Sequence, residues 1–308
     1  MKILITGGAG FIGSHIVDKL IAKNHDVVVV DNLSSGKKEN IHKKAKLIQV
    51  DIADFPHIEE IFIKETPDII YHLAAQIDVR KSVERPVIDA EINILASLNL
   101  IELSKKYRIQ KFIFSSSGGA IYGETDSRPT SESHSEWPVS PYGIGKLTVD
   151  KYLHYYHQVH GLKFTSLRYA NVYGPRQNAH GEAGVVAIFT NKLLTGDHPT
   201  INGSGLQTRD YVFVEDVANA NLLALEHLDA TGVYNIGTEK ETTVNSVFKA
   251  IAQCLNQTIE PIHGPEKQGE QKTSSLDSSK AEKELGWTPT ITFSDGIKKT
   301  TDWFSKNH

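Results

Sequence analysis

The 308-residue chain is poor in cysteine, in net charge and in long apolar runs, and each scarcity excludes a class of protein. Its single cysteine, Cys254, cannot form an internal disulfide, so a reducing, cytoplasmic location is expected. Cys254 lies in an apolar periodic segment, which favours a place in the core. A formal charge of −4 offers no basic surface for nucleic acid. No apolar run is long enough to predict a membrane span or a secretion signal.

Short runs rich in valine and isoleucine alternate with helical patterns over residues 1–170. Most of these runs lack strict polar alternation, as expected for parallel strands buried on both faces. This βαβ repetition predicts an α/β fold with a doubly wound parallel sheet of the Rossmann type. Strands are expected at residues 2–6, 26–31, 46–50, 69–73, 111–116 and 163–169, and helices at 11–24, 58–65, 87–107 and 142–160.

The alternation breaks after about residue 170, so residues 171–308 are expected to form mainly a smaller, substrate-binding C-terminal lobe. The segment 233–236 is the one candidate in this half for a strand that returns to the main sheet. A further strand is expected at residues 208–214, and helices are expected at 184–196, 215–227, 243–255 and 295–304.

A glycine-rich turn joins the first predicted strand to the first predicted helix. Gly7, Gly10 and Gly13 permit a tight turn and the close approach of a pyrophosphate, whose charge a helix N-terminus stabilises. Asp31 ends the second predicted strand, where a carboxylate can bond the ribose hydroxyls of an adenosine. Asn32 follows it, and no arginine is there to hold a 2′-phosphate, so NAD is favoured over NADP.

A tyrosine and a lysine four residues apart open a predicted helix. Tyr142 and Lys146 would share one helix face, where an ammonium favours the phenolate of a proton-transfer pair. Serines 115–117 end the fifth predicted strand, at the edge where open α/β sheets bind ligands. The same spacing joins Tyr107 to Lys111, but Lys111 already begins a strand and no helix holds that pair. No metal site is expected.

Further motifs surround this pair in a fixed order: His-Leu-Ala-Ala-Gln at 72–76, Gly-Gly-Ala-Ile-Tyr-Gly at 118–123, Arg-Tyr-Ala-Asn-Val-Tyr-Gly-Pro-Arg at 168–176 and Thr-Arg-Asp-Tyr-Val at 208–212. With the glycine turn and Tyr142-x-x-x-Lys146, they make the chain resemble the extended short-chain dehydrogenase/reductases, and among these the NAD-dependent epimerase/dehydratase family. The resemblance extends over essentially the whole chain.

The resemblance implies that NAD is held tightly across the glycine turn and the neighbouring strand ends. It assigns to the cofactor Gly7, Gly10, Phe11, Ile12, Gly13, Asp31, Asn32, Ser34, Ser35, Gly36, Asp51, Ile52, Leu73, Ala74, Ala75, Gln76, Asn93, Ser115, Tyr142, Lys146, Tyr169 and Val172.

It also implies a UDP-sugar substrate, bound by Ser116, Ser117, Asn171, Val185, Ile201, Arg209, Tyr211, Val244, Lys267, Glu270 and Ser274. The family usually has an arginine where Lys267 stands, and a lysine cannot make the same planar, two-pronged phosphate contact. Ser274 falls where the family places a residue beside the C2 substituent of the sugar. Because serine is small, N-acetylated sugars are expected to be accepted.

The activity that the resemblance implies is a UDP-sugar 4-epimerase that interconverts UDP-glucose with UDP-galactose and UDP-GlcNAc with UDP-GalNAc through a 4-keto intermediate. Ser117, Tyr142 and Lys146 would be catalytic, with Lys146 and the nicotinamide lowering the pKa of Tyr142. Gly118 and Gly119 stand where sugar dehydratases carry an acid pair, so elimination of water is not expected. A UDP-glucuronate 4-epimerase and a non-catalytic NAD-binding sensor are the alternatives. A homodimer through helices 87–107 and 142–160 is implied as well.

Overall fold

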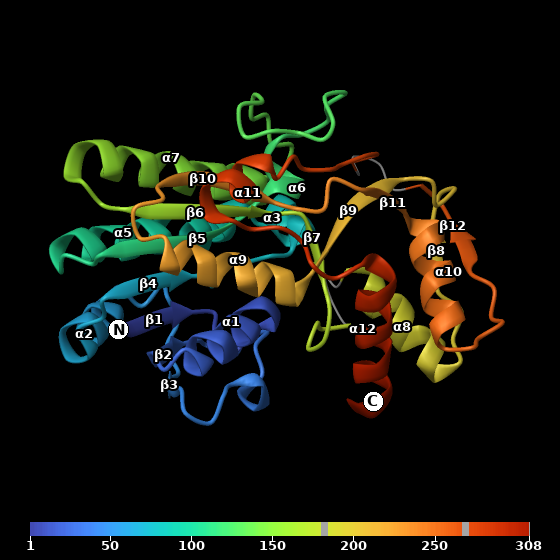
Figure 1. The fold of residues 1–308 in the computed structure, drawn as a ribbon, viewed down its shortest axis with the longest axis horizontal. Coiled ribbons are helices and arrows are strands. Elements are labelled where there is room, and N and C mark those ends of the chain that lie inside the picture. The colour runs from blue at the N-terminus through green and yellow to red at the C-terminus, as the bar shows by residue number, and fades with distance from the viewer. Residues whose placement is uncertain (180–183, 267–270, 308) are drawn as a thin grey trace.

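The structure is a computed structural model that describes residues 1–179, 184–266 and 271–307. Its larger part is a seven-stranded sheet in the order β10-β6-β5-β4-β1-β2-β3, with every pair of neighbours parallel (Figure 1). The predicted doubly wound α/β fold is therefore confirmed. The strands are β1 (Lys2–Thr6), β2 (Asp26–Val30), β3 (Lys46–Ile48), β4 (Ile69–His72), β5 (Lys111–Ser117), β6 (Phe164–Tyr169) and β10 (Gly232–Ile236).

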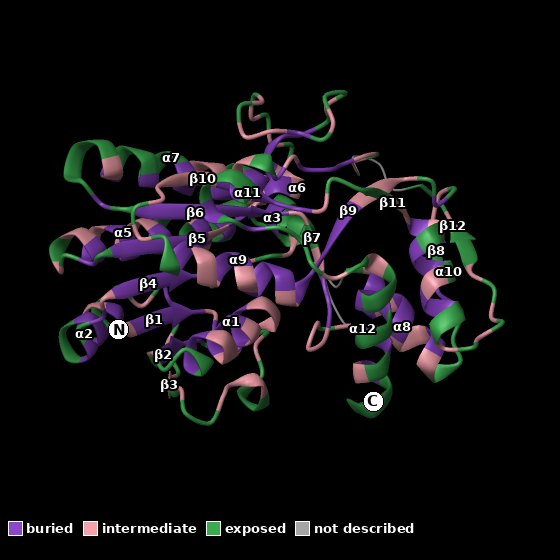
Figure 2. Cartoon of the chain, in the orientation of Figure 1, coloured by how far each residue is buried: buried purple, intermediate pink, exposed green. Residues whose placement is uncertain are grey.

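Helices cover both faces of this sheet, and each face has its own apolar core. Ile3 and Ile5 of β1 point into one core, and Leu4 between them points into the other. This explains why the strands are apolar without alternation. One face is covered by α1 (Phe11–Ala22), α9 (Val214–Glu226) and α11 (Ser279–Leu285), and the other by α2 (Phe55–Glu65), α5 (Ala96–Lys106) and α7 (Pro141–His160). Figure 2 shows the buried residues gathered along the strands and the exposed ones on the outer helix faces.

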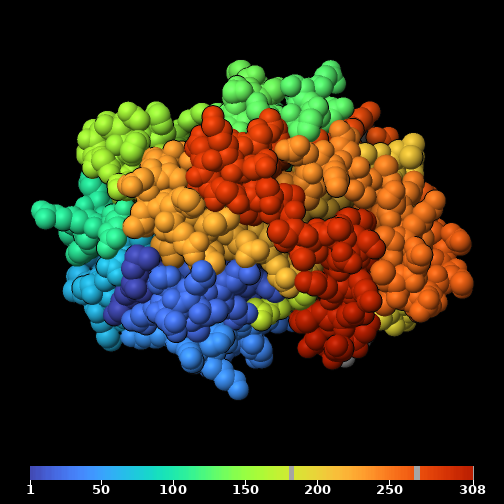
Figure 3. Space-filling view, in the orientation of Figure 1, coloured from blue at the N-terminus to red at the C-terminus, as the bar shows by residue number. Residues whose placement is uncertain are grey.

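The smaller part lies beyond the carboxyl ends of the strands, at the right of Figure 1. Its core is aromatic and aliphatic, with Phe189, Phe213 and Phe248 among its buried residues. Figure 3 shows the C-terminal residues on the surface of this face, between the N-terminal segment and the region of α10. Its elements are β7 (Asn171–Tyr173), α8 (Val185–Thr195), β8 (Thr200–Asn202), β9 (Thr208–Phe213), β11 (Glu241–Thr243), α10 (Val244–Cys254), β12 (Ile262–Gly264) and α12 (Phe293–Asn307).

Several elements of the second half belong to the larger part. β10 pairs with β6 in parallel, with Val233 beside Ser166, so this strand does return to the main sheet. The helices α9 and α11 pack on the same sheet, through Val217 and Leu285 among others.

Two details of the sequence interpretation are wrong. The segment expected as one helix at 87–107 consists of α4 (Pro86–Ala90), one π-helical stretch (Glu91–Leu95) and α5. The widened turn carries Asn93, whose amide donates to the carboxylate of Asp89 at 2.9 Å and to the backbone oxygen of Gln76 at 2.9 Å. Cys254, expected in the core, is exposed at the last residue of α10.

The remaining short elements are the 3₁₀ turn Lys38–Asn40, α3 (Val79–Glu84) and α6 (Gly118–Ile121). In the described ranges, no helix is both long enough and apolar enough to span a bilayer.

Candidate functional site

A cavity of about 530 Å³ opens at the carboxyl ends of the central strands. The glycine turn and the ends of β2 and β4 form part of its wall, and the serine end of β5 with the first turns of α7 forms another part. The remaining wall comes from the smaller part, with β7, β9 and the starts of α8 and α10. The volume is in the range of small-molecule and cofactor sites.

The glycine turn leaves no room for side chains. Gly7 has a φ of +73°, and a Cβ there would lie 2.6 Å from the backbone nitrogen of Ala74. A Cβ at Gly13 would lie 2.2 Å from the Gly7 oxygen. The helix α1 starts after Gly10 without a side-chain cap among the described residues, so its first N–H groups are left for an anion. These features fit a dinucleotide pyrophosphate.

Asp31 is fixed beside the turn. Its carboxylate accepts the backbone N–H of Ala9 at 2.9 Å and that of Leu33 at 2.8 Å. Each carboxylate oxygen keeps further lone-pair capacity, which a ribose hydroxyl can use. The neighbouring Asn32 amide donates to Asp51 at 2.7 Å, and Asn32 lines the cavity with Asp31. An acidic rather than a basic group therefore faces this end of the cavity, which suits NAD.

The start of α7 brings the proton-transfer pair to the serine end of β5. Ser140 caps this helix by accepting the N–H of Gly143 at 3.1 Å, and Pro141 occupies its first turn. Lys146 donates from Nζ to the Ser115 backbone oxygen at 2.8 Å. The same nitrogen lies 5.9 Å from the centre of the Tyr142 ring. The Tyr142 phenol shares a hydrogen bond with Ser117.

Burial dominates the protonation of this pair. It raises the pKa of Tyr142 to about 12. The hydrogen bond from Ser117 acts to lower this pKa, and the charge of Asp89 acts to raise it. Burial also lowers the pKa of Lys146 to about 8, while the charges of Asp150 and Asp89 act in the opposite direction. The expected lowering of the tyrosine pKa is therefore not achieved by the protein's own groups, since the lysine donates to a carbonyl.

Most predicted site residues line this one cavity. From the cofactor set these are Gly7, Gly10, Phe11, Ile12, Gly13, Asp31, Asn32, Ser34, Ser35, Ile52, Leu73, Ala74, Ala75, Ser115, Tyr142, Lys146, Tyr169 and Val172. From the substrate set they are Ser116, Ser117, Asn171, Val185, Arg209, Tyr211 and Val244.

Four predicted cofactor residues lie behind the wall and support it. The side-chain oxygen of Asn93 accepts the backbone N–H of Gln76 at 2.9 Å, and the Asn93 amide donates to the Gln76 backbone oxygen at 2.9 Å. Asp51 supports the wall through Asn32, whose amide donates to the Asp51 carboxylate at 2.7 Å. A Cβ at Gly36 would lie 2.8 Å from the Ala9 side chain, so this glycine permits the turn to pack closely.

Two predicted substrate residues do not line the cavity. Ile201 is buried in the core of the smaller part, and Ser274 is buried without lining the cavity. Lys267 and Glu270 lie outside the described residues.

Some cavity residues were not predicted. Two of them, Val50 and Ile77, follow strand ends, so the rule for ligand sites in open sheets could have found them. Ala170 and Tyr173 lie within the motif at 168–176, which could have marked them. The others depend on how the smaller part packs, and no sequence signal marked them: Gln177, Gly184, Val186 and Gln207. In the described ranges, no group of three or more His, Cys, Asp or Glu side chains is placed to hold a metal ion.

Comparison with known proteins agrees with this geometry. A family profile described as the NAD dependent epimerase/dehydratase family matches residues 3–237. The UDP-glucose 4-epimerase of Mycolicibacterium smegmatis is 41% identical over 309 residues, covering 99% of this chain and 98% of its own length.

Among solved structures, the Thermotoga maritima UDP-glucose 4-epimerase with UDP-glucose has a TM-score of 0.97 and 50% identity, and covers 100% of this chain and 99% of that one. The Thermus thermophilus UDP-glucose 4-epimerase in complex with NAD has a TM-score of 0.94 and 44% identity, covering 99% of both. The Methanobrevibacter ruminantium UDP-N-acetylglucosamine 4-epimerase has a TM-score of 0.94 and 38% sequence identity, and the match covers 100% of this chain and 99% of that one. The chain thus belongs to the NAD-dependent epimerase/dehydratase family.

Proposed function

We propose that the protein is an NAD-dependent UDP-sugar 4-epimerase that interconverts UDP-glucose and UDP-galactose. One observation carries this proposal: a single cavity is lined by the dinucleotide turn, by Ser117 with the Tyr142–Lys146 pair, and by polar groups of the smaller part. A cofactor and a second ligand can therefore meet at the tyrosine. The similarity to 4-epimerases over the whole chain supports the same reaction.

The smaller part supplies groups suited to a nucleoside diphosphate. Arg209 brings a permanent positive charge to the cavity wall, and its guanidinium also donates to the Thr208 backbone oxygen at 2.7 Å. Asn171 adds an amide on the adjoining strand. Val185 and Val244 supply apolar surface at the starts of α8 and α10, which suits the base. We assign the UDP moiety to this wall, which leaves the sugar near Tyr142.

The reaction inverts a carbon that carries no acidic proton, so oxidation and reduction at C4 replace direct deprotonation. NAD, when bound, supplies the acceptor and donor of the C4 hydride and a positive charge at its nicotinamide. Tyr142 takes the proton of the 4-hydroxyl group as the 4-keto sugar forms, and returns it after the sugar has turned over. Ser117 aligns the reacting oxygen, and the phenolate has to form against the effect of burial. The positive charge of a bound nicotinamide, together with that of the nearby Lys146, would favour the phenolate.

Two further properties belong to the proposal. We infer that UDP-GlcNAc and UDP-GalNAc are also substrates, on the similarity to a UDP-N-acetylglucosamine 4-epimerase. We also infer a homodimer, because apolar side chains on α4, the π-helical turn and α7 are exposed, namely Val87, Leu95, Tyr155 and Val159. The unpaired Cys254 suits the cytoplasm.

A panel of UDP-sugars tests the proposal. Purified protein is offered UDP-glucose, UDP-galactose, their N-acetyl counterparts and UDP-glucuronate one at a time, and C4 inversion is scored by proton NMR. We expect inversion at C4 for UDP-glucose and UDP-galactose, and also for their N-acetyl counterparts. Inversion of UDP-glucuronate alone would overturn the hexose assignment. Bound NAD without any inversion would instead support a sensor.

A further inference from the structure

Three successive turns of α7 hold three successive residues of β5. Tyr142 shares a hydrogen bond with Ser117, and Lys146 donates to the Ser115 backbone oxygen at 2.8 Å. One turn further on, the carboxylate of Asp150 accepts the hydroxyl of Ser116 at 3.2 Å. The spacing of four residues places all three helix side chains on one face. Asp150 thus continues the row of contacts that the first two residues begin.

Asp150 is itself held by groups from the neighbouring strand. Arg168 of β6 reaches its carboxylate with Nε at 2.9 Å and with Nη2 at 2.8 Å. Ser166, two residues earlier on β6, donates its hydroxyl to the other carboxylate oxygen at 2.5 Å. The exposed fraction is 2% for Asp150 and 1% for Arg168. Helix α7 is therefore bound to two adjacent strands through one buried carboxylate.

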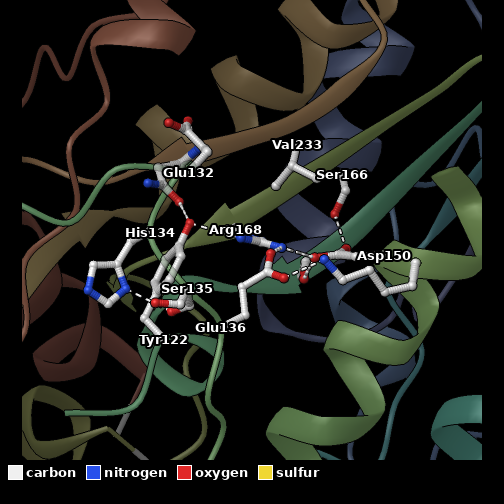
Figure 4. A network of polar contacts seen from close by, with 12 residues as sticks. Tyr122, Glu132, His134, Ser135, Glu136, Asp150, Ser166, Arg168 and Val233 are labelled. Carbon is white, nitrogen blue, oxygen red and sulfur yellow. Dashed lines mark hydrogen bonds and ion pairs between the residues drawn. The ribbon is translucent and has the colours of Figure 1, made fainter. Parts of the chain in front are cut away.

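The guanidinium of Arg168 has further partners besides Asp150. It donates to the Tyr122 hydroxyl at 2.9 Å and to Glu136 at 2.5 Å, and Glu136 also pairs with Lys151. Figure 4 shows Tyr122 on one side of the Arg168 guanidinium and the carboxylates of Glu136 and Asp150 near each other on the other side, where Nη2 reaches both. A buried ion pair adds little net stability compared with apolar packing, so its use here favours a role in fixing geometry.

We propose that Asp150 is a positioning residue for the Tyr142–Lys146 pair. Held by Arg168 and Ser166, it fixes the third turn of α7 against β5, and thereby fixes where the phenol and the ammonium lie relative to residues 115–117. The proposal rests on the proposed function, because it assigns Asp150 to the same reaction. Asp150 does not line the cavity and acts only through the other two residues.

The negative charge of Asp150 also acts on Lys146. Among the described residues, four titratable groups face the Lys146 ammonium: Asp150 and Tyr142 from α7, Asp89 from α4 and His72 from β4. Among them Asp150 makes the largest contribution to keeping Lys146 protonated against burial. Its removal should leave Lys146 neutral over a wider range of pH, and a neutral amine cannot stabilise the phenolate.

The experiment compares Asp150→Asn with a matched control, Glu136→Gln. Both changes remove one carboxylate from Arg168, but within the described residues Glu136 forms its hydrogen bonds and ion pairs with Arg168 and Lys151 and none with β5 or Lys146. We expect Asp150→Asn to lower kcat by about 10- to 100-fold, as for a small misplacement of reacting groups, with bound NAD retained. The Lys146 titration, followed by NMR of ¹³C-labelled lysine, should move to lower pH. Glu136→Gln should leave kcat and the Lys146 titration near their wild-type values. Equal losses of thermal stability in the two variants, with kcat and titration unchanged in both, would overturn the proposal.

A second variant covers the case in which Asp150→Asn does not fold. Ser166 lies outside the cavity wall, and Ser166→Ala removes only one donor to Asp150. A folded Ser166→Ala protein with lowered kcat supports the proposal, whereas one with unchanged kcat contradicts it. If the wild-type protein inverts no UDP-sugar, the proposed function has failed. The lysine titration still decides whether Asp150 acts on Lys146.

Discussion

Tyr142 is the residue on which the chemistry depends most, because burial raises its pKa to about 12 while catalysis requires its phenolate. Tyr142→Phe removes the oxygen that accepts the 4-hydroxyl proton in the proposed mechanism. We expect kcat to fall by a factor of about 10³ or more, at the upper part of the range for general acid–base groups. NAD should stay bound, since the glycine turn and Asp31 are untouched. Turnover and cofactor content, measured on the same preparation, check both statements.

The natural control for this variant is Tyr107→Phe, which alters the other tyrosine of the same spacing. Tyr107 donates its hydroxyl to Glu59 at 2.9 Å, and it does not line the cavity. Its loss should leave kcat unchanged. Near-normal turnover in Tyr142→Phe would remove the tyrosine from the mechanism.

Single residues differ in how far the sequence could predict them. Tyr142, Lys146 and the glycine turn were found because each has a local spacing with a direct physical meaning. Asp150 was not found, since an aspartate in a helix is ordinarily a solvated group. Only the packing of β6 brings Arg168 and Ser166 to it.

At the scale of elements, the start of β5 is tied to the end of α9 by one buried lysine. Lys111 donates from Nζ to the backbone oxygens of Ala224, His227 and Ala230, at 2.9, 2.8 and 2.8 Å. Lys111→Met removes this shared donor, although Ala230 keeps the Thr165 hydroxyl at 2.9 Å and His227 keeps the Ala230 N–H at 3.0 Å. The free energy of unfolding should fall by about 1–3 kcal/mol, as for a buried group that loses its partner. Urea denaturation measures this value.

Lys163→Met is the matched control for that change. Lys163 is half exposed and pairs with Asp229 at 2.6 Å, so its loss should cost less than about 1 kcal/mol. Neither change should alter kcat by more than about twofold, because Lys111 lies at the opposite end of β5 from Ser117. A loss of stability from Lys111→Met no larger than that from Lys163→Met would contradict the role assigned to the lysine.

Helices and strands were predictable where their pattern is local. The apolar runs of β1, β2 and β4 gave the sheet, and Ser140 with Pro141 marks the start of α7. The π-helical turn Glu91–Leu95 was not predictable, because it depends on a contact of Asn93 with Gln76, seventeen residues away. β7 was missed too, since its three residues pair only with the distant β9.

At the scale of the whole molecule, the exposed apolar side chains on the π-helical turn and α7 predict association. Leu95 is 50% exposed, and Leu95→Asp would place a charge in the inferred interface. We expect sedimentation to show a dimer for the wild type and a monomer for this variant. Ile63→Asp is the control, because Ile63 is 59% exposed on α2, outside the inferred interface. A wild-type protein that sediments only as a monomer contradicts the dimer.

The cavity is also a property of the whole molecule, and this limits what the sequence alone could predict. Most residues of the wall around the glycine turn were named in advance, a few from the turn and Asp31 and the rest from the family resemblance. Its opposite wall is made where the smaller part packs against the sheet, so Gln177 and Gln207 carried no signal. Ile201, which the resemblance assigned to the substrate, lies in the core of that part.

The most direct test of the central claim, hydride removal and return at C4, is the fate of a label on that carbon. UDP-glucose carrying deuterium at C4 is converted by the enzyme in ordinary water, and the UDP-galactose formed is examined by NMR. Oxidation and reduction within one cavity predict that the deuterium stays at C4, now in the inverted configuration. Loss of deuterium to the solvent during inversion would show that C4 is deprotonated directly, and would contradict the account.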